Sequence, residues 1–254
     1  MMKILIINPN ISSSLSELIA TEARRCAAKE TEITVLTAPF GVAYIETRAE
    51  AQIAGYAVMQ LAAEHYADYD AVIVAAFGDP GLEALREMLP IPVIGMTDAA
   101  LASAAQLGGR ISIIAISQRI QAWYRETVER EGHLARLVSI RALDETLSDI
   151  SQVQQNQGER LIELANQAVK QDGADSIILA GAPLAGLARS VSSQLPVPAL
   201  DGVSCAVKQA EALIQLYPNQ AQRSGSYALP PRKACKGLSK ELSLLIGGES
   251  ISAS

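Results

Sequence analysis

Residues 70–96, DAVIVAAFGDPGLEALREMLPIPVIGM, decide the fold of this chain. Val72–Ala76 is a short apolar run bounded by turn residues, which is typical of a strand buried on both faces of a parallel sheet. Asp79 before Pro80 predicts that a helix begins there, with Asp79 as its N-cap. Three leucines follow at helical spacing, and a Pro-Ile-Pro segment ends the helix before a second strand at Val93–Gly95.

The same plan returns about a hundred residues later, in residues 174–202, ADSIILAGAPLAGLARSVSSQLPVPALDG. Ile177–Leu179 corresponds to Val72–Val74, and Leu195–Pro198 corresponds to Leu89–Pro92 with one residue inserted between the two anchors. This internal repeat is far longer than a solenoid module. It predicts two copies of one α/β lobe related by a pseudo-twofold axis.

Strand and helix patterns alternate along the whole chain, in eight units with four in each half. Alternation of this kind predicts an α/β fold, in which each lobe is a four-stranded parallel sheet flanked by helices. We expect residues 1–97 and 204–254 to form lobe one and residues 98–203 to form lobe two. The ligand cleft is then expected between the lobes.

Local signals place several helix ends. Ser14 is predicted to cap the first helix, with Glu17 completing a capping box, and Thr47 is predicted to cap the second. A long helix is expected over residues 145–171 and a short final one over residues 239–245.

Composition excludes several classes of protein. The chain has 254 residues, 49% of them hydrophobic, and a net charge of −6, which argues against a nucleic-acid partner. No apolar stretch approaches the ~20 residues that span a bilayer, and the N-terminus does not resemble an export signal. The three cysteines have no metal-like spacing. We therefore expect a cytoplasmic protein with no metal and no membrane contact.

In open parallel sheets, ligands bind beyond the carboxyl ends of the strands. The residues predicted at those ends are Asn8, Phe77, Gly78, Thr97, Ser117, Gly181, Ala182, Pro183, Asp201 and Gly202. Several helices start there, so backbone N–H groups converge on a site suited to an anion or a carbonyl-rich molecule. The N–H groups around the two glycine-rich turns are predicted to face each other.

Some of these residues have a purely structural alternative. Asp201 either ties its own turn or supports the site. Phe40 and Tyr44 either pin a loop by aromatic packing or line the pocket. Cys205 is expected to be a buried structural thiol, and both histidines are expected to be solvated.

Four segments together resemble the aspartate/glutamate/hydantoin racemase superfamily, and most closely its hydantoin and allantoin racemases. They are Ile7–Asn10, Phe77–Gly81, Pro198–Val203 and Gly225–Ala228. The resemblance runs nearly end to end. It implies two similar four-stranded lobes with the site between them, and a hydantoin-, allantoin- or amino-acid-like substrate. It also implies catalysis without any cofactor, and we expect a homo-oligomer.

The resemblance also implies two cysteines on opposite sides of a carbon acid. One thiolate would remove the α-proton, and the other thiol would return a proton to the opposite face. Here Ala76 and Gly181 stand at those two positions, Pro183 replaces a glycine, and Ile11 replaces Thr or Ser. Neither Ala nor Gly can transfer a proton, so the unaltered chain is predicted to be weak or inactive as a racemase.

Three readings follow from the missing thiols. The chain is a natural member with altered chemistry or a binding role, or it is an engineered inactive racemase. Otherwise another group, such as a water held by Ser117 or Thr97, replaces the thiols. These readings leave two hypotheses for the function. The protein is an isomerase-class enzyme that has lost its thiol bases, or it is a non-catalytic binder of the same ligand.

Overall fold

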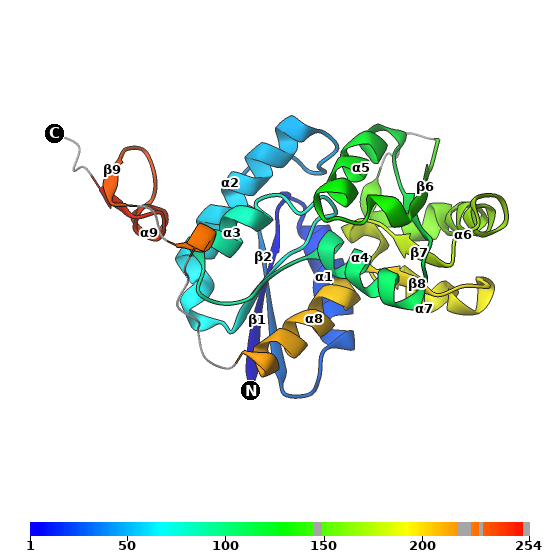
Figure 1. The fold of residues 1–254 in the computed structure, drawn as a ribbon, viewed down its shortest axis with the longest axis horizontal. Helices are drawn as coiled ribbons and strands as arrows, with labels where there is room; N and C mark the ends of the chain where they lie inside the picture. Colours follow the sequence, from blue (N-terminus) through cyan, green and yellow to red (C-terminus); the bar gives the residue numbers. More distant parts are fainter. Residues whose placement is uncertain (145–148, 218–224, 229–230, 251–254) are drawn as a thin grey trace.

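Two four-stranded parallel sheets form the body of the protein in this computed structural model, which describes residues 1–144, 149–217, 225–228 and 231–250 (Figure 1). The first sheet has the order β2-β1-β3-β4, with β1 (Met2–Asn8), β2 (Thr31–Thr37), β3 (Ala71–Val74) and β4 (Val93–Gly95). The second has the order β6-β5-β7-β8, with β5 (Ile111–Ala115), β6 (Leu137–Ala142), β7 (Ser176–Leu179) and β8 (Ala199–Asp201). The predicted pair of four-stranded α/β lobes is confirmed.

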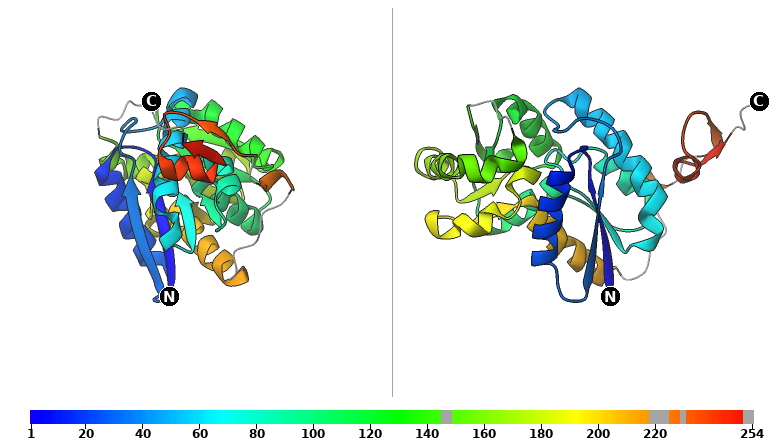
Figure 2. Two further views of the ribbon diagram at one scale, coloured as in Figure 1. Left: turned by 90° about the vertical axis from the view of Figure 1, so that its left-hand side faces the viewer. Right: turned by 180° about the vertical axis from the view of Figure 1, so that it is seen from behind.

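Helices flank both sheets. They are α1 (Ser13–Cys26), α2 (Arg48–His65), α3 (Leu82–Met88), α4 (Met96–Leu107), α5 (Gln121–Arg130), α6 (Val153–Asp172), α7 (Leu187–Val191), α8 (Gly202–Leu216) and α9 (Lys240–Leu245). A further parallel pair, β9 (Lys233–Cys235) and β10 (Gly248–Ser250), was not predicted from the sequence. This tail projects from lobe one beyond α2 and α3 (Figure 2), while Leu242 of α9 is buried in lobe one. No helix in the described part is long and apolar enough to cross a membrane.

The repeat seen in the sequence is also a repeat of hydrogen bonds. The Val72 N–H donates to Pro92 O over 3.0 Å, and the Ile177 N–H donates to Pro198 O over 2.9 Å. The two donors, Val72 and Ile177, correspond to each other in the repeat, and so do the two acceptors, Pro92 and Pro198. Each copy therefore joins its third and fourth strands in the same register.

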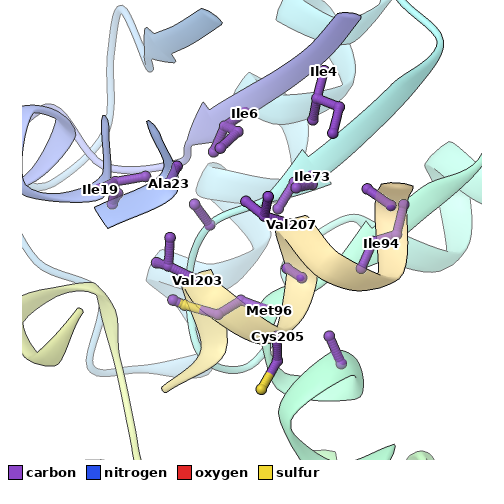
Figure 3. Close-up of a cluster of buried hydrophobic side chains, with 14 of the residues drawn as sticks. Ile4, Ile6, Ile19, Ala23, Ile73, Ile94, Met96, Val203, Cys205 and Val207 are labelled. Atoms are coloured by element: carbon purple, nitrogen blue, oxygen red, sulfur yellow. The ribbon is translucent and has the colours of Figure 1, made fainter. Parts of the chain in front are cut away.

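Helices α4 and α8 each connect the two halves. α4 follows β4 of the first sheet but also packs on β5, β7 and β8, whereas α8 follows β8 and packs on β1, β3 and β4. Figure 3 shows Val203 and Val207 of α8 pointing toward Ile6 and Ile73 of the first sheet. The boundaries at residues 97 and 203 stay predictions.

The helix ends correct two of the local expectations and confirm a third. Ser12, and not Ser14, caps α1: its Oγ accepts from the Leu15 N–H over 3.3 Å, and Ser14 lies inside the helix. Thr47 does cap α2, in a capping box with Glu50. The helix expected from residue 145 begins only at Val153 and runs unbroken through Gly158; residues 145–148 lie outside the described part.

Asp79 caps a different helix from the one expected. α3 begins only at Leu82, with Gly81 at its N-cap and a φ of +83°. The two carboxylate oxygens of Asp79 accept instead from the N–H groups of Thr97 and Asp98, each over 2.9 Å. Asp79 therefore supplies the acceptors for the start of α4. Thr97 and Asp98 lie inside that helix, whose N-cap is Gly95.

Candidate active site

Two equivalent turns follow the third strand of each sheet, and we name them the β3 turn (residues 75–81) and the β7 turn (residues 180–186). In the β3 turn the Asp79 N–H donates to Ala76 O over 3.1 Å, and in the β7 turn the Leu184 N–H donates to Gly181 O over 3.0 Å. Ala76 and Gly181 therefore occupy the same place in two copies of one turn. This is the pairing that the sequence repeat predicts.

Each turn packs against the opposite lobe. Ala76 and Phe77 belong to a buried cluster with Ile178 and other core residues of the second sheet. Ala182 belongs to a cluster with Ile19 and other core residues around the first sheet. The two turns therefore lie at the junction between the lobes, as a site between the lobes requires.

Tyr124 of α5 connects the two turns. Its ring centroid lies 4.6 Å from that of Phe77, and a Cβ added at Gly181 would lie 3.7 Å from its hydroxyl. Sequence reasoning missed Tyr124. The available signal was an aromatic pair, Trp123-Tyr124, on the helix that follows the strand end at Ser117.

Tyr44 brings a second phenol to the same place. Its hydroxyl is buried, and no group among the described residues reaches it in hydrogen-bonding geometry, although it interacts electrostatically with the Tyr124 hydroxyl. Burial raises the pKa of both phenols well above the usual value. Both are therefore neutral near pH 7 and able to donate hydrogen bonds to a carbonyl or carboxylate.

The backbone of the β3 turn is less available than expected. The Gly78 N–H donates to Thr97 Oγ1 over 2.6 Å, and Thr97 is fully buried. The indole of Trp123 covers Gly78 so closely that a Cβ there would lie 2.2 Å from the ring. The Gly78 N–H is therefore used within the protein and not offered to a ligand.

Three other predicted contact residues make hydrogen bonds within the protein. Asn8 is fully buried, and its Nδ2 donates to Ser12 O over 3.1 Å and to Ser16 Oγ over 2.9 Å. Ser117 Oγ accepts from the Arg119 N–H, and Pro183 O accepts from Gln154 Nε2 over 2.8 Å. Direct ligand contact by Asn8, Ser117 and Pro183 stays a prediction.

Gly181 has a backbone that favours glycine strongly. Its φ is +100° and its ψ is 154°, a region that residues with a Cβ rarely adopt. Space is not the obstacle, because an added Cβ would meet Pro183 Cδ at an ordinary 3.5 Å. The β7 turn is therefore shaped for glycine at this position.

The β3 turn and the β7 turn contain no cysteine. No group of three or more His, Cys, Asp or Glu among the described residues is arranged to hold a metal ion. Burial raises the pKa of Cys26 and Cys205 to about 11, and both pack in or against the core around α8. Cys205 is thus the structural thiol that the sequence predicts.

The whole body of the chain matches known proteins. The family model described as Asp/Glu/Hydantoin racemase matches residues 4–210. A hydantoin racemase of Paenarthrobacter aurescens is 35% identical over 234 residues, covering 91% of this chain and 99% of the relative. An allantoin racemase structure from Klebsiella pneumoniae superposes with a TM-score of 0.89 at 32% identity, covering 95% and 99% of the two chains.

A glutamate racemase from Bacillus anthracis shares the fold at 18% identity, with a TM-score of 0.59 and coverage of 99% and 97%. The two parallel sheets, the paired turns and these matches lead to one conclusion. The chain belongs to the Asp/Glu/hydantoin racemase family.

Proposed function

We propose that this protein binds a small hydantoin-, allantoin- or amino-acid-like carbon acid between its lobes, with little or no racemisation of it. The observation that carries the proposal is the pairing of Ala76 and Gly181 in two equivalent turns beside Tyr124. Family membership supports the ligand class. The side chains at the two turns support binding more than proton transfer.

Racemisation needs a base on one face of the α-carbon and an acid on the other, each within ~3 Å. Ala76 and Gly181 carry no group that can accept or return a proton. The phenols of Tyr44 and Tyr124 remain neutral near pH 7, so they are poor bases but good hydrogen-bond donors. A carboxylate or ureido carbonyl is the ligand group that such donors would hold.

Two alternatives to this proposal remain. A water held by Ser117 or Thr97 would serve as the base, in which case the unaltered chain would exchange the α-proton. An engineered loss of both thiols would give the same chemistry as natural loss, so it differs from our proposal in history only. The expected homo-oligomer and cytoplasmic location are further proposals; sedimentation and cell fractionation would test them.

The deciding experiment is incubation in D₂O with L-allantoin, 5-substituted hydantoins, aspartate and glutamate, followed by proton NMR. We expect saturable ligand binding in at least one case, with the α-proton signal retained. A Tyr124→Phe variant should weaken that binding. Fast racemisation by the unaltered chain would show that another residue is the base and would contradict the proposal.

A further inference from the structure

We propose that a second cavity, between α2, α3 and α5, binds an α-amino acid with an aromatic side chain. The cavity has a volume of about 360 Å³, within the ~300–1,000 Å³ of typical small-ligand sites. Its walls include Gly78–Gly81 of the β3 turn but neither Ala76 nor Gly181. It is therefore a different site from the one between the lobes, and its occupancy does not depend on the function proposed there.

Several lining residues of the cavity suit an aromatic ring. Trp123, Tyr56 and Met59 line it, together with the small side chain of Ala84. Aromatic rings gain from offset or edge contacts with other rings, and a methionine sulfur packs favourably near ring edges. A ligand ring placed there would contact the two aromatic rings and the methionine, and the small side chain of Ala84 would leave space for it.

The charged groups of the cavity suit the head group of an amino acid. Arg130 of α5 and Glu83 of α3 line it, with Arg130 Nε 2.6 Å from Glu83 Oε1. Their side chains are 42% and 58% exposed, so the ion pair contributes little to the stability of the fold. Charged groups of a ligand can therefore replace each partner at little cost. An ammonium group would pair with Glu83 and a carboxylate with Arg130.

Simpler ligands fit less well. Arg130 Nε also lies 3.1 Å from Glu131 Oε1, so a carboxylate without an ammonium group would compete for Arg130 with two acidic side chains and leave Glu83 without a new partner. A cation without a carboxylate would meet Arg130. A zwitterion satisfies both signs, which is why we commit to an amino acid.

The cavity adjoins the β3 turn directly. Trp123 packs on Gly78, and Arg130 Nη2 donates to Gly78 O over 3.4 Å. Tyr124, next in sequence, contacts Phe77. Occupancy of the cavity is therefore expected to alter the affinity of the site between the lobes, and by linkage the converse; this coupling alone rests on the proposed function.

Trp123 makes the test direct, because it is the single tryptophan of the chain. We expect L-phenylalanine to change the Trp123 emission saturably. Alanine lacks the ring, 2-phenylethylamine lacks the carboxylate, and 3-phenylpropanoate lacks the ammonium group. Each should bind at least about tenfold more weakly, as expected for loss of one charge-assisted contact or of the ring contacts.

Matched variants separate the pocket from general effects on α5. Arg130→Met should weaken phenylalanine binding about tenfold or more. Arg48→Met is the control, because Arg48 of α2 likewise forms an ion pair with an element next to the cavity, through Glu126 of α5, but does not line the cavity. Ala84→Leu, at a half-buried site, should fill the cavity and abolish binding; circular dichroism would confirm that each variant is folded.

Three results would overturn the proposal. One is no saturable change in Trp123 emission and none in amide NMR spectra with phenylalanine. Another is equal weakening by Arg130→Met and Arg48→Met. The third is a signal that persists in folded Ala84→Leu and is displaced by hydantoins, which would place the amino acid between the lobes instead.

Discussion

At the scale of single residues, Gly181 sets the limit on restoring the family chemistry. Ala76→Cys changes a buried residue that does not have a positive φ, and it should permit exchange of the α-proton from one face. Gly181→Cys must place a Cβ on a backbone with a φ of +100°, which costs about 1–3 kcal/mol. We expect Ala76→Cys alone to give deuterium exchange without inversion, and the double variant to give slow inversion as well.

The measurement is proton NMR in D₂O combined with polarimetry on the same sample. General acid–base groups each contribute ~10²–10⁴-fold, so the gain should be conspicuous. Urea unfolding would show whether Gly181→Cys carries the expected strain. Inversion at equal rates with and without a cysteine at residue 76 would refute this assignment of the site.

Asp79 gives a prediction about pH. Burial raises the pKa of Asp79 to about 7, from 3.8, although two backbone N–H groups act in the other direction. Between those values the folded protein holds a proton that the unfolded chain has released. The contribution of Asp79 to the free energy of unfolding is therefore full below about pH 4 and falls as the pH rises to about 7.

Asp79→Asn removes this titration. The amide can accept only one of the two N–H groups, so the variant should be about 1–3 kcal/mol less stable at pH 5. The deficit should shrink between pH 5 and pH 8, because only the parent protein loses stability through Asp79. Urea unfolding across that range is the measurement, and a deficit that stays constant would exclude a titrating Asp79.

At the scale of elements, Asp79 also shows how far sequence reasoning extends. Capping rules are local, so Asp-Pro-Gly predicted a cap for the helix that follows directly. The structure uses the same carboxylate 18 and 19 residues further along, at Thr97 and Asp98. The residue and its type of role were right, but its partner depends on how β3 and β4 lie side by side, which no local pattern contains.

The same limit explains Tyr124. The repeat predicted Ala76 and Gly181 as a pair because they lie in the repeated segment itself. Tyr124 comes from α5, and its place between the turns follows from packing of one lobe on the other. The eight strands of the two sheets and the pairing of Ala76 with Gly181 were thus predictable, whereas the contacts that cross between the lobes were not.

Packing of α5 on the β3 turn leads to a third prediction. Gly78→Ala would place a Cβ 2.2 Å from the Trp123 ring on a backbone with a φ of +108°. Overpacking and strain together should lower the free energy of unfolding by at least about 3 kcal/mol. Gly132→Ala is the control, because it has a φ of +76° but nothing within 4 Å, and should cost only about 1–2 kcal/mol.

Urea unfolding followed by circular dichroism would compare the two variants, and Trp123 emission would report displacement of α5. Equal losses for both would mean that the turn moves away from α5 without cost. In that case Trp123 could not hold the β3 turn in place.

At the scale of the whole molecule, each sheet is packed against a helix that directly follows the last strand of the other sheet. α4 follows β4 and packs on the second sheet, and α8 follows β8 and packs on the first. α4 and α8 pack against each other, and a Cβ at Gly202 would lie 2.1 Å from Met96 Cγ. The acid Glu22 of α1, which is buried, accepts from Ser204 Oγ of α8 over 2.8 Å. Neither sheet is covered completely without a helix that starts at the last strand of the other.

This arrangement predicts that the lobes unfold together, although proteins of this size often unfold in stages. Val207→Ala is the sharpest test. Val207 lies on α8, directly after the second sheet, yet it is fully buried in the cluster around the first sheet. Its truncation should cost about 2 kcal/mol.

If the lobes are coupled, hydrogen exchange in β5 and β7 should accelerate as much as exchange in β1 and β3, because all four strands open in one cooperative event. Exchange that accelerates only in β1 and β3 would mean that the lobes unfold independently and that the crossing helices merely touch.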